Sequence, residues 1–458
     1  MDKHTLQLSL TASLLPLAAL SAGAADEASP ASGADAPRDG CPNIVWIMTD
    51  QHTATALSCA GNPYVHTPNL DRLAERGIRF TNAYCTAPLS GPSRTAMFTG
   101  LYPDEVGMIR NGAPLPAELQ PRLLGNVVGT AGYDCVYGGK WHVGPQLDVP
   151  AESGFSMIHP HSDTGLAEAC AAWLSQTHAR PDLLVASFDN PHNICEAARF
   201  QPLPYGEVEL PQRLPPVPRN WRRSRRDADV LLWEQSANYA IYPTLRWNRR
   251  DWRRHRAIYY ALVEKVDAEI GKIIDAIDFE HTIVVFTSDH GEGAGAHHWN
   301  QKSALYEEVV NIPLIVCLPG GARCGEVREQ LISNGIDIYS SICDWVGAQA
   351  TGQGQSFRQI AEQDAPGQEY VVTETTFDKG VTRGWMLRTH HFKYVLYDKG
   401  KNREQLFDMD RDRLERHNLA GKERYRDELL RHRSLLRFWM QQNHVKPTRR
   451  TSGDIPEN

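Results

Sequence analysis

Ser90 precedes a predicted helix, a position at which a serine hydroxyl could take part in catalysis or bind an anion. Residues 90–100 read Ser-Gly-Pro-Ser-Arg-Thr-Ala-Met-Phe-Thr-Gly. Pro92 stands where a helix can begin and Gly100 where it can end, so we expect Ser90 to lie just ahead of the helix N-terminus. The free N–H groups and the dipole at that end favour negative charge. An ordinary serine N-cap is nevertheless the commoner role for a serine at such a position.

Polar residues also follow a predicted buried strand. Residues 43–49 form a short apolar run rich in β-forming side chains, and Asp50 and Gln51 come directly after it. Buried parallel strands have this composition, and ligands collect at their carboxyl ends. Further apolar strands are predicted over residues 182–188, 282–288 and 313–318. Helical patterns lie between these strands, so we expect an α/β fold with a large, mostly parallel sheet flanked by helices.

Two helices have clear signals. Residues 67–77 combine a threonine N-cap, a proline at the first helical position and a terminating glycine. The longest helix is predicted from Asp251 to about Ile277, where aliphatic side chains recur on one stripe. Such a stripe indicates a helix that packs against the sheet.

The sequence changes in character after about Thr351. Residues 352–367 are polar and rich in Gly and Gln, as in a linker, and residues 384–397 alternate like a half-buried antiparallel strand pair. A final helix is predicted from about Glu423 to Gln442. We therefore expect a large domain over 41–351, a linker over 352–367, a small C-terminal α+β subdomain with an antiparallel sheet over 368–445, and a tail over 446–458.

The first 24 residues have the order of a secretory signal. A basic start precedes an apolar stretch from about Leu6 to Leu20, and Ala22 and Ala24 supply a small-residue cleavage site. The stretch is short for a membrane anchor, and no later segment predicts a membrane span. We expect a signal peptide over 1–24, a flexible spacer over 25–40, and export to the periplasm or the extracellular space.

Charge and cysteine content exclude two other classes of protein. The 458 residues carry 48 Lys and Arg against 55 Asp and Glu, a net charge of −7, which argues against a protein that coats nucleic acid. The 9 cysteines have no paired spacing, so no zinc module is predicted, although one or two disulfides could form after export.

The Ser90 segment resembles the signature of the sulfatase family in the alkaline-phosphatase superfamily. The matching residues are Ser90, Pro92, Ser93, Arg94, Thr99 and Gly100. The resemblance implies an alkaline-phosphatase-like fold and oxidation of Ser90 to formylglycine (3-oxoalanine). Because the residue is Ser rather than Cys, it also implies a bacterial, anaerobic radical-type maturase as a partner. In such enzymes one hydroxyl of the hydrated aldehyde attacks sulfur, and loss of a proton from the other later expels sulfate.

The same resemblance assigns a metal site to two strand ends. Asp50 and Gln51 correspond to the pair that opens the family's metal site, and Asp289 and His290 to the pair that closes it, with Ser90 beside them. Either pair alone could instead be a capped turn. Carboxylate and amide oxygens suit Ca²⁺ first and Mg²⁺ second. Gln51 in place of a second Asp, and His290 in place of Asn, depart from the family's commonest pattern and leave the identity of the metal open.

Several basic residues match further family motifs. Lys140 and Lys302 would each hold a sulfate oxygen, and Arg94 would neutralise the hydrated nucleophile. His142 would contact the formylglycine hydroxyl and take its proton in the elimination step. These roles rest on the resemblance, since a single basic residue is more often a solvated surface group.

His192 follows the strand predicted over residues 182–188 and resembles the family's Pro-His element. An imidazole that titrates near neutrality can donate a proton to a leaving alcohol, so His192 is the candidate general acid. The resemblance is close from Pro42 to about Pro319 and resumes over residues 384–419.

An insert rich in Arg and Trp spans residues 219–256. Basic groups beside indole rings suit an anionic sugar, although a solvated helix face with packed tryptophans has the same composition. Arg110, Asn111 and His298 are further candidates for substrate contact, and His297 is a weaker one.

The resemblance implies an exported bacterial sulfatase that hydrolyses O-sulfate esters of carbohydrates by S–O cleavage. Sulfamate (N-sulfate) substrates stay open as an alternative. So does a phosphate or phosphonate monoester hydrolase of the same superfamily. The alternative from another class is a glycan-binding protein in which Ser90 is unmodified. No nucleic-acid partner and no membrane span are expected.

Overall fold

The computed structural model describes residues 40–377 and 381–445. The predicted signal peptide, the spacer up to residue 39 and the tail over 446–458 lie outside the described residues. Within the described part of the chain, no helix combines the length and the apolar character needed to cross a membrane.

An eight-stranded sheet forms the larger part of the fold. Its strands are β1 (Asn43–Asp50), β2 (Ile78–Tyr84), β3 (Asp134–Gly139), β4 (Ser156–His159), β5 (Asp182–Pro191), β6 (Thr282–Ser288), β7 (Leu314–Cys317) and β8 (Glu326–Ser333). They lie in the order β4-β3-β5-β1-β6-β7-β2-β8. All neighbours pair in parallel except β7, which is antiparallel to both β6 and β2. The predicted α/β fold with a mostly parallel sheet is confirmed.

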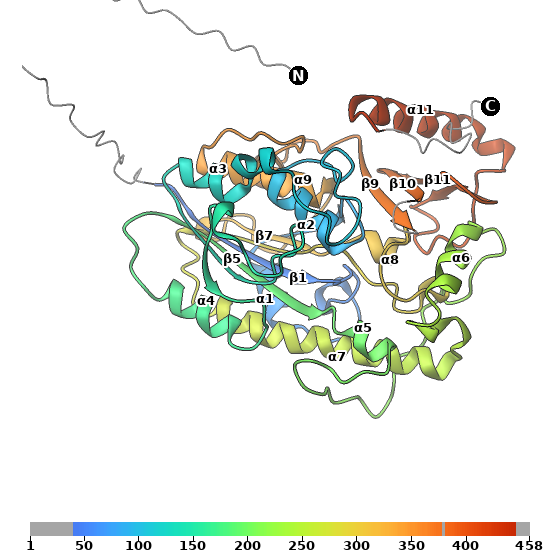
Figure 1. Cartoon of the computed structure of the whole chain (residues 1–458), viewed down its shortest axis with the longest axis horizontal. Helices are drawn as coiled ribbons and strands as arrows, with labels where there is room; N and C mark the ends of the chain where they lie inside the picture. The colour runs from blue at the N-terminus through green and yellow to red at the C-terminus, as the bar shows by residue number, and fades with distance from the viewer. Residues whose placement is uncertain (1–39, 378–380, 446–458) are drawn as a thin grey trace, which may run out of the picture. The chain divides into compact units, whose positions relative to one another are not determined.

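Helices cover both faces of this sheet (Figure 1). On one face lie α1 (Pro68–Arg76), α4 (Leu166–Leu174) and α7 (Arg249–Ile274), and on the other lie α2 (Ser90–Thr99), α3 (Leu124–Thr130), α9 (Asn334–Val346) and α10 (Arg358–Gln363). Strand β1 shows why both faces are apolar, since Val45 and Ile47 join one core while Trp46 and Met48 join the other. The shorter helices α5 (Ile194–Ala198), α6 (Asp229–Ala237) and α8 (Glu307–Val310) lie in the connections.

Helix α2 begins earlier than the sequence pattern predicts. Ser90 is its first residue rather than the residue ahead of it, and the N-cap is Leu89. Pro92 lies inside the first turn, where backbone N–H groups have no partner within the helix, so its missing N–H costs nothing. Gly100 ends the helix with a φ of 70°, as predicted.

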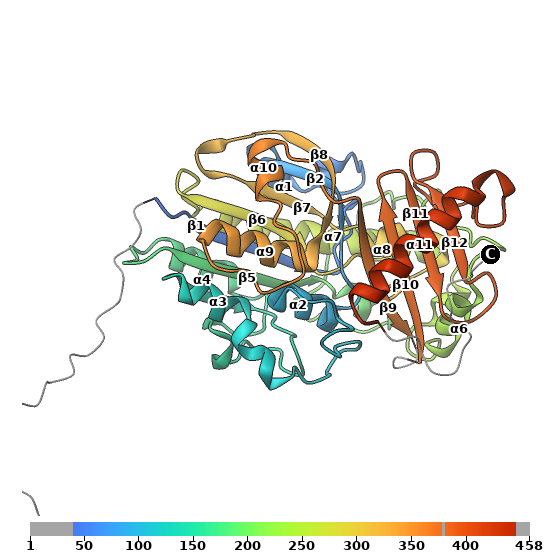
Figure 2. The same cartoon turned by 90° about the horizontal axis from the view of Figure 1, so that it is seen from above.

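A second sheet follows in the C-terminal part of the chain (Figure 2). Its strands are β9 (Tyr370–Phe377), β10 (Thr382–Thr389), β11 (Phe392–Tyr397) and β12 (Glu404–Asp408), which pair antiparallel in sequence order. Helix α11 (Arg426–Gln442) packs on this sheet through Leu436 and Trp439. The predicted antiparallel sheet of the C-terminal subdomain is confirmed.

The segment over residues 352–367, expected to be a linker, contains helix α10. Phe357 and Ile360 are buried in the same core as α9. Residues 352–367 are therefore packed against the large domain in spite of their polar, Gly-rich composition, because a few apolar side chains are enough to hold the segment in the core. All 9 cysteines are free thiols in the structure.

Candidate active site

Four neighbouring strands of the large sheet bring their carboxyl ends to one place. In the order β3-β5-β1-β6, all pairs are parallel, with Gly139 opposite Ser187 and Thr49 opposite Ser288. The residues just beyond these ends therefore gather although they are far apart in sequence. They include most of the residues that the sequence singles out for chemistry.

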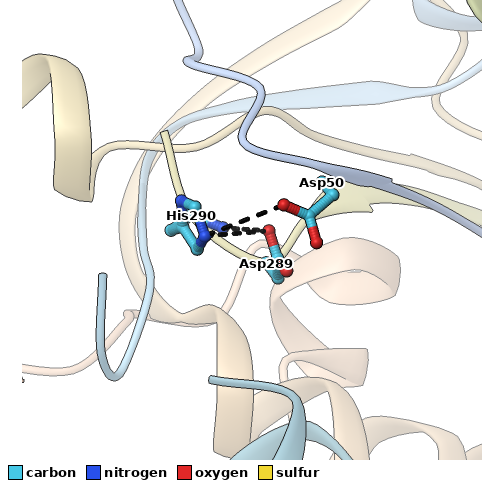
Figure 3. A group of neighbouring side chains, drawn as sticks. All are labelled: Asp50, Asp289 and His290. Carbon is cyan, nitrogen blue, oxygen red and sulfur yellow. Dashed lines mark hydrogen bonds and ion pairs between the residues drawn. The ribbon is translucent and has the colours of Figure 1, made fainter. Parts of the chain in front are cut away.

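Asp50, Asp289 and His290 form a buried group that could hold a metal ion (Figure 3). The Nε2 atom of His290 lies 3.9 Å from Oδ1 of Asp50 and 3.7 Å from Oδ1 of Asp289. Their candidate ligand atoms all lie within 4.8 Å of one another. Burial lowers the pKa of His290, which favours the neutral imidazole that a metal requires.

Ser90 faces this group from the N-terminus of α2. Its Oγ atom lies 3.0 Å from Nε2 of His290 and 3.4 Å from Oδ1 of Asp50. The N–H group of Gly91 donates to Oδ1 of Asn111 at 2.9 Å, which fixes the first turn of the helix. The structure thus brings Ser90 together with the two strand-end pairs.

Arg94 joins the two carboxylates of the group. Its Nε donates to Oδ2 of Asp289 at 2.9 Å, and a terminal nitrogen lies 3.3 Å from Oδ2 of Asp50. The side chain is fully buried. Burial opposes the charge of this guanidinium, but the two carboxylates raise its pKa further. Arg94 is one helical turn after Ser90, so the motif spacing places both at the same strand ends.

Lys140 is a second buried cation in contact with Asp50. Its Nζ lies 2.9 Å from Oδ2 of Asp50 and 2.6 Å from Oδ1 of Asp189. Burial alone would raise the pKa of Asp50, but Lys140 and the neighbouring basic groups hold it well below its ordinary value. Gly139, just before Lys140, allows the ends of β3 and β5 to lie close together. A Cβ atom at this position would lie 2.0 Å from the carbonyl oxygen of Ser187, and the φ of Gly139 is 91°.

Two histidines near these cations are held neutral. Burial, followed by the charge of Lys140, lowers the pKa of His142 to about 3. Burial, Lys140 and Lys302 lower the pKa of His192 well below its ordinary value. Within the described residues, Nδ1 of His142 has no hydrogen-bond partner. Both rings are therefore neutral in the free site.

Lys302 reaches the site through Gln51. Its Nζ donates to Oε1 of Gln51 at 3.1 Å, while Nε2 of Gln51 donates to Oε2 of Glu292 at 2.5 Å. Oε1 of Glu292 accepts from the N–H groups of Ala294 at 3.0 Å and Gln301 at 2.7 Å. Glu292 therefore orients the Gln51 amide and shapes the loop that carries Lys302.

Three further carboxylates at the site, those of Glu292, Asp189 and Asp163, have no role predicted from the sequence. Both Oδ atoms of Asp163 accept backbone N–H groups, from Asp189 at 2.6 Å and from Asn190 at 2.9 Å, in the segment just before His192. Glu292 and Asp189 stand within two or three residues of predicted site residues, a signal that could have drawn attention to them. Asp163 offers no such signal.

Two predicted substrate contacts form no hydrogen bond or ion pair with the strand-end residues in the described part of the chain. Arg110 is exposed and precedes Asn111, whose side chain contacts the backbone of Gly91. The ring of His298 packs against Trp221 and Trp252, because its turn faces the insert. Asn111 contacts only the backbone of Gly91 among the site residues.

A polar cavity of about 190 Å³ adjoins Leu89 and Lys302. Its other lining residues include Gln235, Asn238, Tyr242 and Asn300. Amide and phenol groups of this kind form hydrogen bonds with hydroxyl groups. A ligand in this cavity would contact Lys302 and Leu89, the residue before Ser90.

Comparison with known proteins agrees with the geometry. Residues 42–348 match the sulfatase family, and residues 295–438 match the family described as N-sulphoglucosamine sulphohydrolase, C-terminal. The chain is 28% identical to the Delta 4,5-hexuronate-2-O-sulfatase of Bacteroides thetaiotaomicron, over 88% of this chain and 90% of that protein. It is 26% identical to the N-acetylglucosamine-6-O-sulfatase of the same organism, over 90% of this chain and 87% of that protein.

A solved structure of a 2-O GAG sulfatase superposes with a TM-score of 0.78 at 26% identity, covering 88% of this chain and 93% of that chain. The two family matches together span residues 42–438, which include every strand of both sheets and the residues of the strand-end site. The chain therefore belongs to the sulfatase family of the alkaline-phosphatase-like superfamily, and it is a sulfuric ester hydrolase.

Proposed function

We propose that this enzyme removes O-sulfate groups from carbohydrates by S–O cleavage, with Ser90 matured to formylglycine as the nucleophile. The observation that carries the proposal is the position of Ser90, whose Oγ lies 3.0 Å from His290 and 3.4 Å from Asp50. The hydrated aldehyde supplies one hydroxyl that attacks sulfur and a second that allows the sulfate to leave. An unmodified serine would end as a stable sulfate ester.

The side chains around Ser90 suit a divalent metal ion. Asp50, Asp289 and His290 would hold it, with Oε1 of Gln51 as a further oxygen donor. Two carboxylates and an amide favour a hard cation, so Ca²⁺ is the first choice and Mg²⁺ the second. When bound, such an ion would polarise the sulfate oxygens of the substrate and reduce the negative charge near the nucleophile.

Lys140 and Lys302 bind the sulfate group of the substrate in this proposal. Lys140 contacts Asp50, and Lys302 contacts Gln51, so the two ammonium groups reach the proposed metal ligands from different loops. Arg94 adds a fixed positive charge that needs no rearrangement during the reaction. Together these three positive charges favour binding of the anionic sulfate group.

His142 and His192 move protons in opposite directions. The neutral ring of His142 takes the proton of the second formylglycine hydroxyl in the elimination step that expels sulfate. His192 donates a proton to the leaving alcohol, which requires the ring to be charged in the complex. Because Lys140 and Lys302 contribute to its low pKa, an anionic sulfate bound against both lysines offsets them and favours that charge.

The carbohydrate would occupy the polar cavity beside Lys302. Relatives act on sugars sulfated at different positions, a hexuronate at O2 and an N-acetylglucosamine at O6 by their names. The match of residues 295–438 to an N-sulphoglucosamine sulphohydrolase keeps N-sulfate as the second candidate bond. We further propose export of the chain to the periplasm or beyond, and maturation by an anaerobic radical-type maturase.

The test is desulfation of a panel of defined sulfated mono- and disaccharides by protein produced together with such a maturase. Mass spectrometry of the peptide that contains Ser90 should show a residue two hydrogens lighter than serine. Ser90→Ala should lower kcat/KM by at least about 1,000-fold without loss of the fold. Ser175→Ala, an exposed serine at the end of α4, is the matched control and should retain full activity.

Two outcomes would redirect the proposal. Faster turnover of an aryl phosphate than of an aryl sulfate by matured enzyme would favour a phosphate or phosphonate hydrolase. An unmodified Ser90 in protein from the native host, with glycan binding but no turnover, would favour a glycan-binding protein.

A further inference from the structure

A second cavity, of about 450 Å³, includes His297, in the turn over residues 296–298, among its lining residues. It is lined by Arg219, Arg222, Arg249 and Arg416, together with Asn220 and Trp221. These residues come from the insert, the first turn of α7 and the segment after β12. The Arg-rich insert noted in the sequence therefore forms part of a concave surface.

The arginines of this cavity are poorly neutralised by the protein. Arg219 and Arg222 are exposed and form no ion pair with any carboxylate of the described chain. The guanidinium of Arg249 stacks on the ring of Trp221, 5.1 Å from its centroid. Arg416 has one partner, Asp412, at 3.5 Å. A concave surface with this excess of positive charge attracts anions.

The floor of the cavity is rigid. Asn220 is 2% exposed, and its Nδ2 lies 3.1 Å from Nε2 of His297, 2.8 Å from Oε1 of Glu308 and 3.2 Å from the carbonyl oxygen of Leu414. The N–H group of His297 donates to the carbonyl oxygen of Asn220 at 2.8 Å. The segment with the arginines is thereby fixed to two other parts of the chain, which reduces the entropy lost on binding.

Two unsatisfied polar atoms belong to residues that line this cavity. In the described part of the chain, Oδ1 of Asn220 and Nε1 of Trp221 have no hydrogen-bond partner. An indole N–H can donate to a hydroxyl or anionic oxygen of a sugar, and an amide carbonyl oxygen can accept from a sugar hydroxyl. An indole ring can also stack on a sugar face.

The segment over residues 297–300 connects this cavity, along the chain, with the cavity beside Lys302. His297 lines the arginine cavity, while Trp299 and Asn300 line the cavity beside Lys302. Gln235, which lines the cavity beside Lys302, donates to the carbonyl oxygen of His298 at 2.7 Å. One short segment therefore contributes to both surfaces.

We infer that the arginine cavity binds a second anionic group, a carboxylate or a sulfate, on an acidic oligosaccharide whose sulfate ester reaches Ser90. The inference rests on the proposed function, because it takes the ligand to be a sulfated carbohydrate. It narrows the substrate class to glycans with at least two anionic groups.

The test measures binding by calorimetry in a Ser90→Ala background, so that the glycan stays intact. The probes are tetrasaccharides from chondroitin sulfate and from heparin, with desulfated and carboxyl-reduced forms of each. The variant Arg219→Gln/Arg222→Gln should raise Kd about tenfold for at least one tetrasaccharide. The control Arg250→Gln/Arg254→Gln removes the same charge from exposed positions on α7 and should change Kd less than twofold. Comparison of the desulfated and carboxyl-reduced forms identifies which anion the cavity binds.

An equal loss in both double variants, or no loss in either, would overturn the inference. So would a single-stranded DNA decamer that binds more tightly than the tetrasaccharides with the same dependence on Arg219 and Arg222. Arginine-dependent glycan binding without turnover by matured wild-type enzyme would refute the proposed function but not the cavity. Turnover of the tetrasaccharides that is unchanged in matured Arg219→Gln/Arg222→Gln enzyme would refute the role of the arginine cavity but not the proposed function.

Discussion

Carboxylates and cations alternate around Ser90. The carboxylates are Asp50, Asp189 and Asp289, and the cations that contact them or Gln51 are Arg94, Lys140 and Lys302. Buried charges are tolerated only when they are paired in this way. Because the basic groups keep the pKa of Asp50 well below its ordinary value, its oxygens remain available as metal ligands across the physiological range.

Glu292 is the residue in this site whose role can be tested most directly. Glu292→Gln keeps the shape but removes the charge and one of the two acceptors that hold Gln51 and the loop of Lys302. We expect kcat/KM on the best sulfated sugar to fall 10–100-fold, as for other residues that orient ligands. Since Glu292 acts through Lys302, the effects of Glu292→Gln and Lys302→Met should be less than additive in the double variant. Glu269→Gln, on the surface of α7, is the control, and full additivity would contradict the assignment.

The resemblance to the sulfatase family predicted Ser90, Asp50, Asp289, His290 and Lys140 as one site, and the structure brings them together. Those residues carry motif signals at strand ends, where parallel pairing aligns them. Glu292 and Asp163 act by orienting neighbouring residues. Such a role depends on which backbone N–H groups lie within about 3 Å of the carboxylate. Most of these groups are not close in sequence to the carboxylate that they contact, so no local sequence pattern predicts the role. Arg110 and His298 were placed near the substrate without a strand end to fix them, and the structure does not join them to the site.

At the scale of elements, boundaries follow from capping chemistry. Helix α7 begins at Arg249, ahead of the predicted Asp251, because Asn248 caps it. Oδ1 of Asn248 accepts from the N–H of Arg250 at 2.7 Å, and Oδ2 of Asp251 accepts from the N–H of Asn248 at 2.9 Å. The apolar stripe predicts that a helix exists, whereas its first residue depends on this reciprocal pair. The antiparallel direction of β7 could not be predicted from its sequence either, because a short apolar run does not indicate in which direction the strand will pair.

Strand β9 carries a carboxyl group that should make stability depend on pH. Glu374 is 5% exposed, and the nearest guanidinium, that of Arg383, lies 3.7 Å from it but 2.7 Å from Asp104. Burial, with the charge of Asp104, raises the pKa of Glu374 from 4.5 to about 8. The folded chain thus binds a proton more strongly than the unfolded chain at this residue, so its contribution to stability is complete below pH 4.5 and is lost as pH rises through 8.

Glu374→Gln should remove this dependence, since glutamine resembles the protonated form. The free energy of unfolding of wild type relative to the variant should fall by on the order of 3–5 kcal/mol between pH 5 and pH 9. Urea titrations at both pH values measure it, and Glu329→Gln, an exposed residue of β8, should leave the wild-type profile unchanged. A difference that is constant with pH would show that Glu374 is ionised throughout.

At the scale of the whole molecule, positive charge is concentrated although the net charge is −7. Arg219, Arg222 and Arg249 of the insert gather at one cavity, whereas Arg94 and Lys140 are buried and paired with carboxylates. An acidic protein with a local positive surface repels polyanions in general but can bind them at that surface. Higher salt should therefore weaken binding of acidic oligosaccharides more than it weakens turnover of a small aryl sulfate.

The two sheets are joined by a buried ion pair network. Lys393 of β11 is fully buried, and its Nζ lies 3.0 Å from Oε2 of Glu307 in α8 and 2.7 Å from Oε1 of Glu415. Burial would lower the pKa of Lys393, but these two carboxylates raise it. The hydroxyl of Tyr84 in β2 donates to Oε1 of Glu307 at 2.7 Å, so the network reaches the large sheet.

Lys393→Met should destabilise the protein by about 3–5 kcal/mol, because it leaves two carboxylates buried without a cation. Thermal unfolding followed by calorimetry should then separate into two transitions, with the part that contains the four-stranded sheet melting first. Adding Glu415→Gln to Lys393→Met should recover part of the loss by removing one of the uncompensated charges, a result that mere loss of packing would not give. Lys422→Met, at an exposed position, should change stability by less than about 0.5 kcal/mol. A single transition at the wild-type temperature in Lys393→Met would show that apolar contacts alone hold the two sheets together.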